Sequence, residues 1–506
     1  AVGDNAGANI AAGGNYNTAF GYAALKDNAT SDGMTAIGKS AAEHATGNHF
    51  LTAIGYRAAE NCATNAYGGV AIGCGALRAG KGNGTIAIGM NAGENIQQNG
   101  NIAIGRDAMR GTVTGDGNHM FGYGSGKCIT AGKYNVGLGH HTLCKTTTGS
   151  CNVAVGNHAM CMNVSGCCNV AVGNSSLINN VIGNHNVALG FTAMLCNISG
   201  CENIAVGSYA LQQNKTGSNN VAIGACSQRN ITGSRNISMG QCALATVTTG
   251  YANVAIGHEA ARLMNANSRS NTILGDQAMV NATYATTNVA VGNEAMANLG
   301  YGGSSNVAVG SSAGRYNNAS YNIFIGYSSG FCNTTGNGLV SIGYAALCQS
   351  KTGSRNTAVG CYAQACNISG SSNTSLGAAT LCANTIGCKN VAIGDCSMKA
   401  VTTGSCNVAV GESTLTQLTT GKNNVAIGRY AGASLTAGSS NNIIIGCNAQ
   451  ASAQPMSHEI TLGDSQITKF RIPGLQSGAS SGHVMCYDGT SLVLAAASGG
   501  GGSLSL

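Results

Sequence analysis

The chain has 506 residues, of which 77 are glycine, two are proline, seven are phenylalanine and none is tryptophan, and only 8% are charged. Ordinary globular chains hold about 25% charged residues and about 7% glycine. The scarcity of large side chains excludes a set of conventional enzyme cores, and two prolines exclude a collagen helix. The net charge of +7 is spread without clusters, so no nucleic-acid partner is predicted. No apolar segment is long enough for membrane insertion.

A phrase Asn-h-Ala-h-Gly, in which h is an apolar residue, recurs along almost the whole chain. Its closing glycine, the anchor glycine, occurs 27 times, and the intervals average 17.0 residues with none departing from 17 by more than one. In chain order the anchors stand at positions 21, 38, 55, 73, 89, 105, 122, 139, 156, 173, 190, 207, 224, 240, 257, 275, 292, 310, 326, 343, 360, 377, 394, 411, 428, 446 and 463. A constant period of this kind is typical of repeat architectures.

Each unit begins with a strand-like alternation. In the segment from Asn152 to Gly156, the two valines share one face, while Asn, Ala and Gly share the other. A second apolar pair follows, such as Ala159-Met160, and then a polar turn ending in Thr-Gly or Ser-Gly, as in Thr148-Gly149. Glycine is expected to supply the corners with positive φ. A 17-residue unit is too short for two packed helices, so the pattern predicts one solenoid coil per unit.

The position four residues before the anchor is Asn in 21 of the 27 units. Identical amides stacked about 4.8 Å apart can hydrogen-bond along the column, so we predict an asparagine ladder. A polar binding stripe is the alternative interpretation of this column. Its clearest members are Asn152, Asn169, Asn186, Asn203 and Asn220.

The predicted fold is all-β, a β-solenoid of about 27 coils with a 17-residue period and a length of about 130 Å. Each coil buries only a few small apolar side chains, which leaves a marginal core once chain ordering is subtracted. We therefore expect side-by-side association into a parallel homotrimeric fibre. The predicted organisation is a repeat shaft over 1–463, a transition segment over 464–474 and a small C-terminal module over 475–506 with a flexible Gly/Ser-rich end.

Phrases such as Lys215-Thr-Gly-Ser-Asn-Asn-Val-Ala-Ile-Gly224 resemble the head repeats of trimeric autotransporter adhesins. They are even more similar to the repeat shafts of tail fibres from phages and large DNA viruses. The segment from Glu459 to Gly474 resembles the transition that closes such viral shafts, and the segment from Gly482 to Gly489 resembles a short module that follows it. The resemblance covers over nine-tenths of the chain, and it implies a trimeric β-solenoid fibre that displays or contacts a receptor.

The 22 cysteines have an informative register. Several flank the same polar turn and others stand at one register in neighbouring coils, so turn staples and links between coils are both feasible. Such disulfides would indicate an extracellular or virion-surface setting. The alternative is a set of free thiols that act as small apolar residues. The candidate disulfide residues are Cys144 with Cys151, Cys161 with Cys167 or Cys168, Cys196 with Cys201, Cys382 with Cys388, and Cys226 with Cys242.

Sequons of the form Asn-x-Ser/Thr lie six to eight residues past an anchor, on what we expect to be an exposed turn. An Asn- and Thr-rich composition also produces sequons by chance. Asn236 and Asn373 stand in the ladder column and are expected to be inaccessible. The candidate glycosylation sites are Asn28, Asn163, Asn197, Asn214, Asn281, Asn333 and Asn367.

No catalytic residue, cofactor or metal site is predicted. The segment from Gly75 to Gly82 approaches a phosphate-binding loop but lacks its Ser or Thr and a following helix. The pair His140-His141 is interpreted as a solvated surface feature, although histidines on a trimer axis can bind a metal.

The predicted function is therefore a non-enzymatic structural fibre on a virion surface, which mediates or supports host attachment. The expected partners are further copies of the chain, other virion proteins and a host-surface receptor or glycan. A cell-surface adhesin or extracellular matrix filament of a cellular organism is the alternative. An ice-binding solenoid is a third class, because regular threonine columns on flat solenoids can order water.

Overall fold

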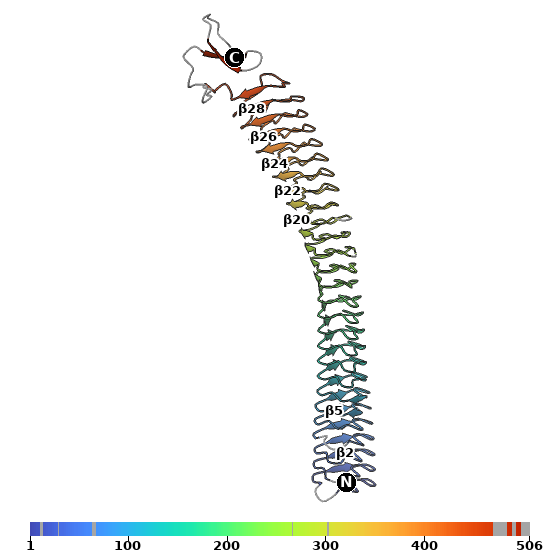
Figure 1. Cartoon of the computed structure of the whole chain (residues 1–506). Coiled ribbons are helices and arrows are strands. Elements are labelled where there is room, and N and C mark those ends of the chain that lie inside the picture. Colours follow the sequence, from blue (N-terminus) through green and yellow to red (C-terminus); the bar gives the residue numbers. More distant parts are fainter. Residues whose placement is uncertain are drawn as a thin grey trace.

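The computed structural model describes residues 1–10, 14–28, 30–62, 67–265, 267–300 and 303–468, together with the backbone of 483–487 and 492–496. Over this part the chain is all-β, without a helix. It winds into one long, gently curved rod, along which the sequence runs steadily from one end to the other (Figure 1). The predicted β-solenoid is confirmed.

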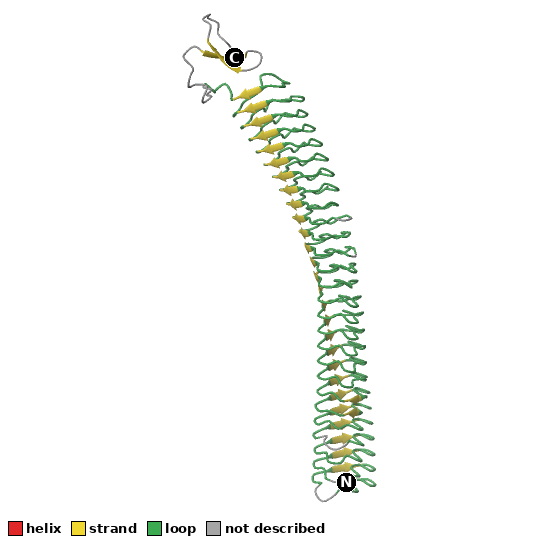
Figure 2. Ribbon diagram, viewed as in Figure 1, coloured by secondary structure: helices red, strands yellow, loops and turns green. Residues whose placement is uncertain are grey.

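The rod is built on a single parallel sheet of 27 strands. Each of these strands has three residues and ends immediately before an anchor glycine, so the 17-residue period is confirmed at every unit. Figure 2 shows the strands as one row of arrows, with the turns of all coils projecting from it. The strands of the sheet are β1 (Thr18–Phe20), β2 (Thr35–Ile37), β3 (Thr52–Ile54), β4 (Val70–Ile72), β5 (Ile86–Ile88), β7 (Ile102–Ile104), β9 (His119–Phe121), β10 (Val136–Leu138), β11 (Val153–Val155), β12 (Val170–Val172), β13 (Val187–Leu189), β14 (Ile204–Val206), β15 (Val221–Ile223), β16 (Ile237–Met239), β17 (Val254–Ile256), β18 (Thr272–Leu274), β19 (Val289–Val291), β20 (Val307–Val309), β21 (Ile323–Ile325), β22 (Val340–Ile342), β23 (Thr357–Val359), β24 (Thr374–Leu376), β25 (Val391–Ile393), β26 (Val408–Val410), β27 (Val425–Ile427), β28 (Ile443–Ile445) and β29 (Ile460–Leu462).

Two smaller pairings complete the described strands. The turns of two neighbouring coils form a short parallel pair, β6 (Asn95–Ile96) with β8 (Thr112–Val113). Near the C-terminus β30 (His483–Tyr487) pairs antiparallel with β31 (Leu492–Ala496). This hairpin falls in the C-terminal module expected over 475–506. Most of the expected transition segment and the Gly/Ser-rich end lie outside the described residues.

Within the sheet, identical positions stack on one another. In β11 and β12, for example, Ala154 pairs with Ala171 and Val155 with Val172. The alanine at the strand centre is fully buried, whereas the two β-branched residues that flank it are half-buried or exposed. The interior of the coil is therefore lined by the smaller side chain of the alternation, and the larger side chains point outward.

The interior is narrow because the second apolar pair fills it from the opposite side. Ala159 and Met160 are both fully buried under β11. In β21 the large Phe324 replaces the central alanine, and glycine stands at the facing positions, Gly314 and Gly330. A Cβ on Gly314 would come within 2.6 Å of the phenylalanine ring. Such volume compensation is expected in a close-packed core, where extra methylene groups force strain. At this coil the glycines make room for the phenylalanine ring.

The chain turns from strand to interior through two consecutive tight turns. In the coil after Gly207, Ala210 N donates to Gly207 O at 3.3 Å and Gln212 N donates to Tyr209 O at 3.3 Å. The third residue of each turn, Tyr209 and then Leu211, has φ of 61° and 50°. These left-handed positions are occupied by ordinary residues in most coils, so they do not require glycine.

Two kinds of glycine serve different purposes. The anchor Gly207 does have a positive φ, of 130°. Gly149, at the end of a polar turn, is not among the residues with positive φ, but a Cβ there would lie 2.6 Å from Gly166 O and 2.8 Å from Asn163 Nδ2. The glycine of the Thr-Gly and Ser-Gly turns is therefore required by the close approach of the next coil.

Candidate interaction surfaces

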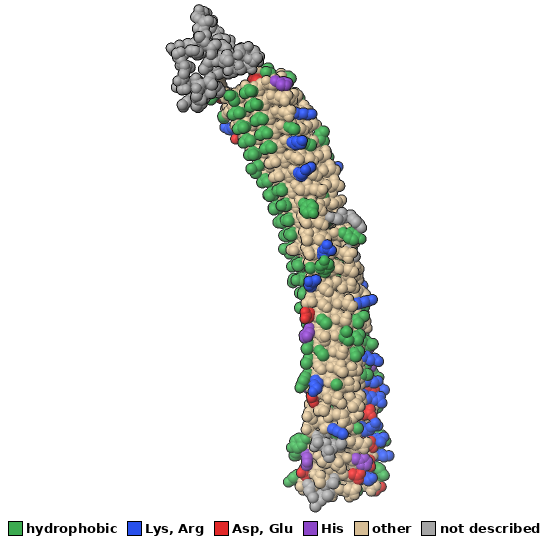
Figure 3. Space-filling model, in the orientation of Figure 1, with side chains coloured by type: hydrophobic (Ala, Val, Ile, Leu, Met, Phe, Trp, Pro, Cys, Tyr) green, Lys and Arg blue, Asp and Glu red, His purple; other side chains and the backbone are tan. Residues whose placement is uncertain are grey.

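An apolar band runs along the strand side of the rod. It consists of the outward residues of the 27 strands, the first and third of each, which are mostly Val, Ile or Leu and are half-buried or exposed. We name this band the outer stripe. In Figure 3 it is visible as a continuous line of apolar side chains along the upper half of one edge. A contiguous exposed apolar surface of this extent is typical of an interaction site.

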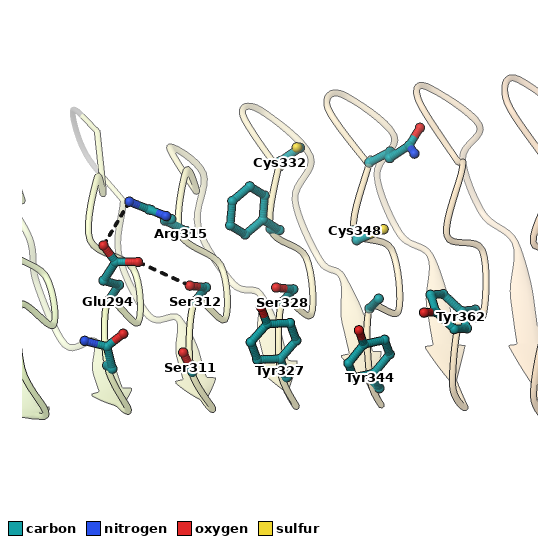
Figure 4. A pocket seen from close by; sticks show the side chains of 14 residues that line it. Glu294, Ser311, Ser312, Arg315, Tyr327, Ser328, Cys332, Tyr344, Cys348 and Tyr362 are labelled. Carbon is teal, nitrogen blue, oxygen red and sulfur yellow. Dashed lines mark hydrogen bonds and ion pairs between the residues drawn. The ribbon is translucent and has the colours of Figure 1, made fainter.

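A shallow groove of about 600 Å³ lies just beyond the strand ends, where five coils from Asn293 to Tyr362 meet. We name it the tyrosine groove. Its floor carries Tyr327 and Tyr344, whose ring planes differ by only 13° with centres 5.4 Å apart. Tyr362 closes one end, with its ring nearly perpendicular to that of Tyr344 at 5.2 Å. Figure 4 shows the rings of Tyr327 and Tyr344 side by side along the rod, each next to the end of its strand.

The other end of the tyrosine groove is charged. Arg315 Nη2 donates to Glu294 Oε1 at 2.9 Å, and Ser312 Oγ donates to Glu294 Oε2 at 3.4 Å (Figure 4). The Arg315 guanidinium also lies 5.8 Å from the centre of the Phe331 ring, within cation–π range. The groove thus combines a flat aromatic floor with fixed donors and acceptors, a composition that suits a ligand with both apolar faces and polar edges.

The structure places the five predicted ladder residues in one buried column. Asn186 Nδ2 donates to Asn169 Oδ1 at 3.2 Å and to Gly200 O at 2.8 Å, and Asn203 repeats both bonds one coil later. The backbone N of each Asn also donates to the Oδ1 of the preceding one. The same amide bonds link Asn152, Asn169 and Asn220 to their neighbours. The column therefore lies inside the coil and is no binding stripe.

The expected exposure of the glycosylation candidates is wrong for six of the seven. Asn28, Asn163, Asn197, Asn214, Asn333 and Asn367 are fully buried, and only Asn281 is exposed. Asn197 is representative: its Nδ2 donates to Gly200 O at 3.0 Å and to Asn180 Oδ1 at 2.8 Å. Nδ2 is the atom that carries an N-linked glycan, and here it is buried and donates hydrogen bonds within the solenoid. Asn236 and Asn373 are buried, as predicted.

These buried residues form a second asparagine column, which the sequence interpretation missed. The spacing from the anchor glycine marks this column in the sequence. Asn163, Asn197 and Asn214 each stand seven residues after an anchor glycine, and each is followed by x-Ser/Thr-Gly. The small glycine admits the next coil, and its carbonyl accepts from the asparagine, as Gly166 O does from Asn163 at 3.0 Å. The sequon pattern is thus a by-product of turn geometry.

Several cysteines act on cysteines of the neighbouring coil. The structure shows 21 of them, among the described side chains, as free thiols. Cys161 lowers the pKa of Cys144, and after burial Cys151 raises the pKa of Cys168 and Cys226 raises the pKa of Cys242. The last of these pairs is one of the sequence candidates, whereas the cysteine that acts on Cys144 is Cys161 rather than Cys151.

The remaining turn candidates engage the backbone of their own column. Cys201 Sγ donates to Ser199 O at 3.4 Å and accepts from Asn184 N at 3.3 Å. Cys167 and Cys388 make the same two contacts in their coils. These thiols replace the serine hydroxyls that occupy this position elsewhere, for example Ser150. The sulfur atoms of Cys167, Cys201 and Cys388 are thus hydrogen-bonded to the backbone of their own turn and of the neighbouring coil.

The histidine pair gains a third member. His140 and His141 lie with ring centres 4.3 Å apart, and His158 from the next coil lies 5.5 Å from His141. Burial, followed by the neighbouring charges of His141 and His158, lowers the pKa of His140. No group of three or more His, Cys, Asp or Glu in the described chain is arranged to hold a metal ion.

The glycine-rich segment from Gly75 to Gly82 lies in a solenoid turn between β4 and β5.

Over the described residues, no helix has the length and apolar character needed to cross a bilayer. Comparisons of the chain with models of protein families, with curated proteins and with solved structures give no match in any of the three.

Proposed function

We propose that this chain is the shaft of a non-enzymatic structural fibre on a virion surface, where it mediates or supports attachment to a host. The observation that carries the proposal is the outer stripe, a mostly apolar surface that recurs with the period of the 27 stacked strands. A surface with this constant period suits alignment with an identical rod, and the resemblance of the repeats to viral tail-fibre shafts supplies the biological setting.

In this proposal the rods associate as a parallel homotrimer through the outer stripe. A monomer leaves residues such as Val172 and Ile204 at 39% and 40% exposure. Removing apolar surface from water stabilises by about 25 cal/mol per Å², and the gain accumulates along the rod. Association of identical copies also places identical residues in contact, which closed symmetry permits.

We expect charges on the outer stripe to separate the rods. The double variant Val172→Asp, Ile204→Asp should sediment as a monomer at micromolar concentration, because each carboxylate would be buried against an apolar surface. The matched control Met162→Asp, Ile198→Asp changes residues of similar exposure, 42% and 43%, on the turn side and should remain trimeric. Analytical ultracentrifugation distinguishes these results. A monomeric wild-type protein, or equal loss of assembly in the control, would refute this interface.

The tyrosine groove is the surface that we propose for receptor contact, since none of its lining residues belongs to the strands that carry the outer stripe. Purified rods should compete with virus of the same source for attachment to its host cells. The double variant Tyr327→Ala, Tyr344→Ala should require about a tenfold higher concentration, because the aromatic floor is lost. Tyr56→Ala is the matched control: Tyr56 and Tyr344 both directly follow an anchor glycine and are both 48% exposed.

The competition experiment has two opposing outcomes. Failure of the wild-type rod to compete, together with labelling of cells rather than virus particles by antibodies against the chain, would favour the adhesin or matrix filament. Equal loss of competition in Tyr56→Ala would remove the tyrosine groove from the proposal. Ice binding receives no support, because the flat strand face presents mainly Val, Ile and Leu where a threonine array is required.

A further inference from the structure

Three pairs of cysteines occupy equivalent positions in adjacent coils. The backbone fixes their register: Lys145 N donates to Cys161 O at 2.8 Å, Cys168 N to Ser150 O at 3.0 Å, and Cys242 N to Ala225 O at 2.9 Å. Residues related in this way lie about 4.8 Å apart along the stack. That separation is within the range of about 4.4–6.8 Å between Cα atoms that a disulfide requires.

The two thiols of each pair also influence one another: Cys161 lowers the pKa of Cys144, and after burial Cys151 raises the pKa of Cys168 and Cys226 raises the pKa of Cys242. None of the six belongs to the strands of the outer stripe. Five of them are half-buried or exposed and open to small reagents, whereas Cys144 is buried beside the half-buried Cys161.

The environment of the first pair favours reaction. The hydrogen bond from Cys161, with a further one from His141, lowers the pKa of Cys144 to about 5, while the same contact raises the pKa of Cys161. A thiolate is the attacking species in thiol–disulfide exchange, and its neighbour serves as the resolving thiol.

We propose that Cys144 with Cys161, Cys151 with Cys168, and Cys226 with Cys242 form disulfides that staple adjacent coils, made by exchange with a low-molecular-weight disulfide such as oxidised glutathione. In the first step the Cys144 thiolate attacks one glutathione sulfur, forms a mixed disulfide and releases a glutathione thiolate. In the second step Cys161 loses its proton, attacks the Cys144 sulfur and releases the second glutathione. Two protein thiols lose two electrons, and one glutathione disulfide becomes two molecules of glutathione.

A staple between coils closes a loop of about one repeat, so it restricts local opening of the rod. For a loop of this length the entropy model gives about a hundredfold lower population of the open state. Amide exchange in the stapled coils is therefore expected to slow by about that factor on oxidation, while coils remote from the staples keep their rates.

The pairing is tested on the purified full chain, incubated with oxidised glutathione, alkylated without reduction, digested and mapped by tandem mass spectrometry. We expect three linked peptide pairs, 144 with 161, 151 with 168 and 226 with 242, and alkylated Cys196 and Cys201. In Cys144→Ser the thiol of Cys161 should become alkylatable while the other two links persist. Links within turns, such as Cys144 to Cys151 or Cys382 to Cys388, would overturn the proposal, and so would alkylation of all six thiols after oxidation.

Discussion

Replacing Gly190 with alanine is expected to open the rod at that coil, lowering the local free energy of unfolding by about 3–5 kcal/mol. Gly190 has φ of 140°, a region open essentially to glycine alone. A Cβ at this position would also lie 2.6 Å from Gly207 O in the next coil. The backbone cannot retreat from this contact without breaking the register between β13 and β14. Native-state hydrogen exchange of these coils measures the effect locally.

Gly100→Ala is the matched control for this prediction. Gly100 has φ of 64°, but no atom lies within 4 Å of the position of its missing Cβ. Alanine there meets only the cost of the left-handed backbone, about 1–2 kcal/mol. Similar destabilisation by the two variants would show that close stacking of the anchor glycines adds nothing to the stability of the rod.

Replacing Asn186 with alanine should destabilise its coil by about 3 kcal/mol or more, because several buried partners lose their hydrogen bonds at once. Asn186 Oδ1 accepts from both the backbone N and Nδ2 of Asn203 at 3.0 Å, and its Nδ2 donates to Gly200 O at 2.8 Å. Each buried polar group left without a partner costs about 1–3 kcal/mol. Faster exchange is expected in the coils on both sides, since the ladder joins neighbours.

The exposed Asn157 provides the control, because Asn157→Ala removes an amide outside both asparagine columns. Its effect should stay within about 0.5 kcal/mol. A comparable loss of stability in the two variants would show that replacing any asparagine of the coil has this effect, and that the hydrogen bonds of the ladder add no stability of their own. Thermal unfolding followed by circular dichroism gives an independent measurement.

The position of every strand in the sheet was predictable from the sequence, because the anchor glycine and its apolar neighbours leave one extended segment per period. The direction of the side chains was not. In Val153-Ala154-Val155 the alternation is equally consistent with either face inward, and the larger residues would ordinarily be assigned to the core. The second apolar pair determines which face of the strand turns inward. Because the buried Met160 already fills the interior, only the small side chain of Ala154 fits beside it.

The wrong expectation at the glycosylation candidates has a clear origin. Asn197 was interpreted from its three-residue sequon, whereas its relevant neighbour, Asn180, lies 17 residues away. In a solenoid, spatial proximity follows the period rather than local spacing. The tyrosine groove escaped prediction for the same reason, since Tyr327 and Tyr344 become neighbours only through the stacking of coils.

The in-register stacking has a consequence for how such a molecule changes over generations. Insertion or removal of one whole 17-residue unit would preserve every pairing between the coils that remain, because each coil is matched only to the one before and the one after. The rod would lengthen or shorten by about 4.8 Å at each such step. The number of repeats in the gene therefore sets the length of the rod, and with it the distance between its two ends.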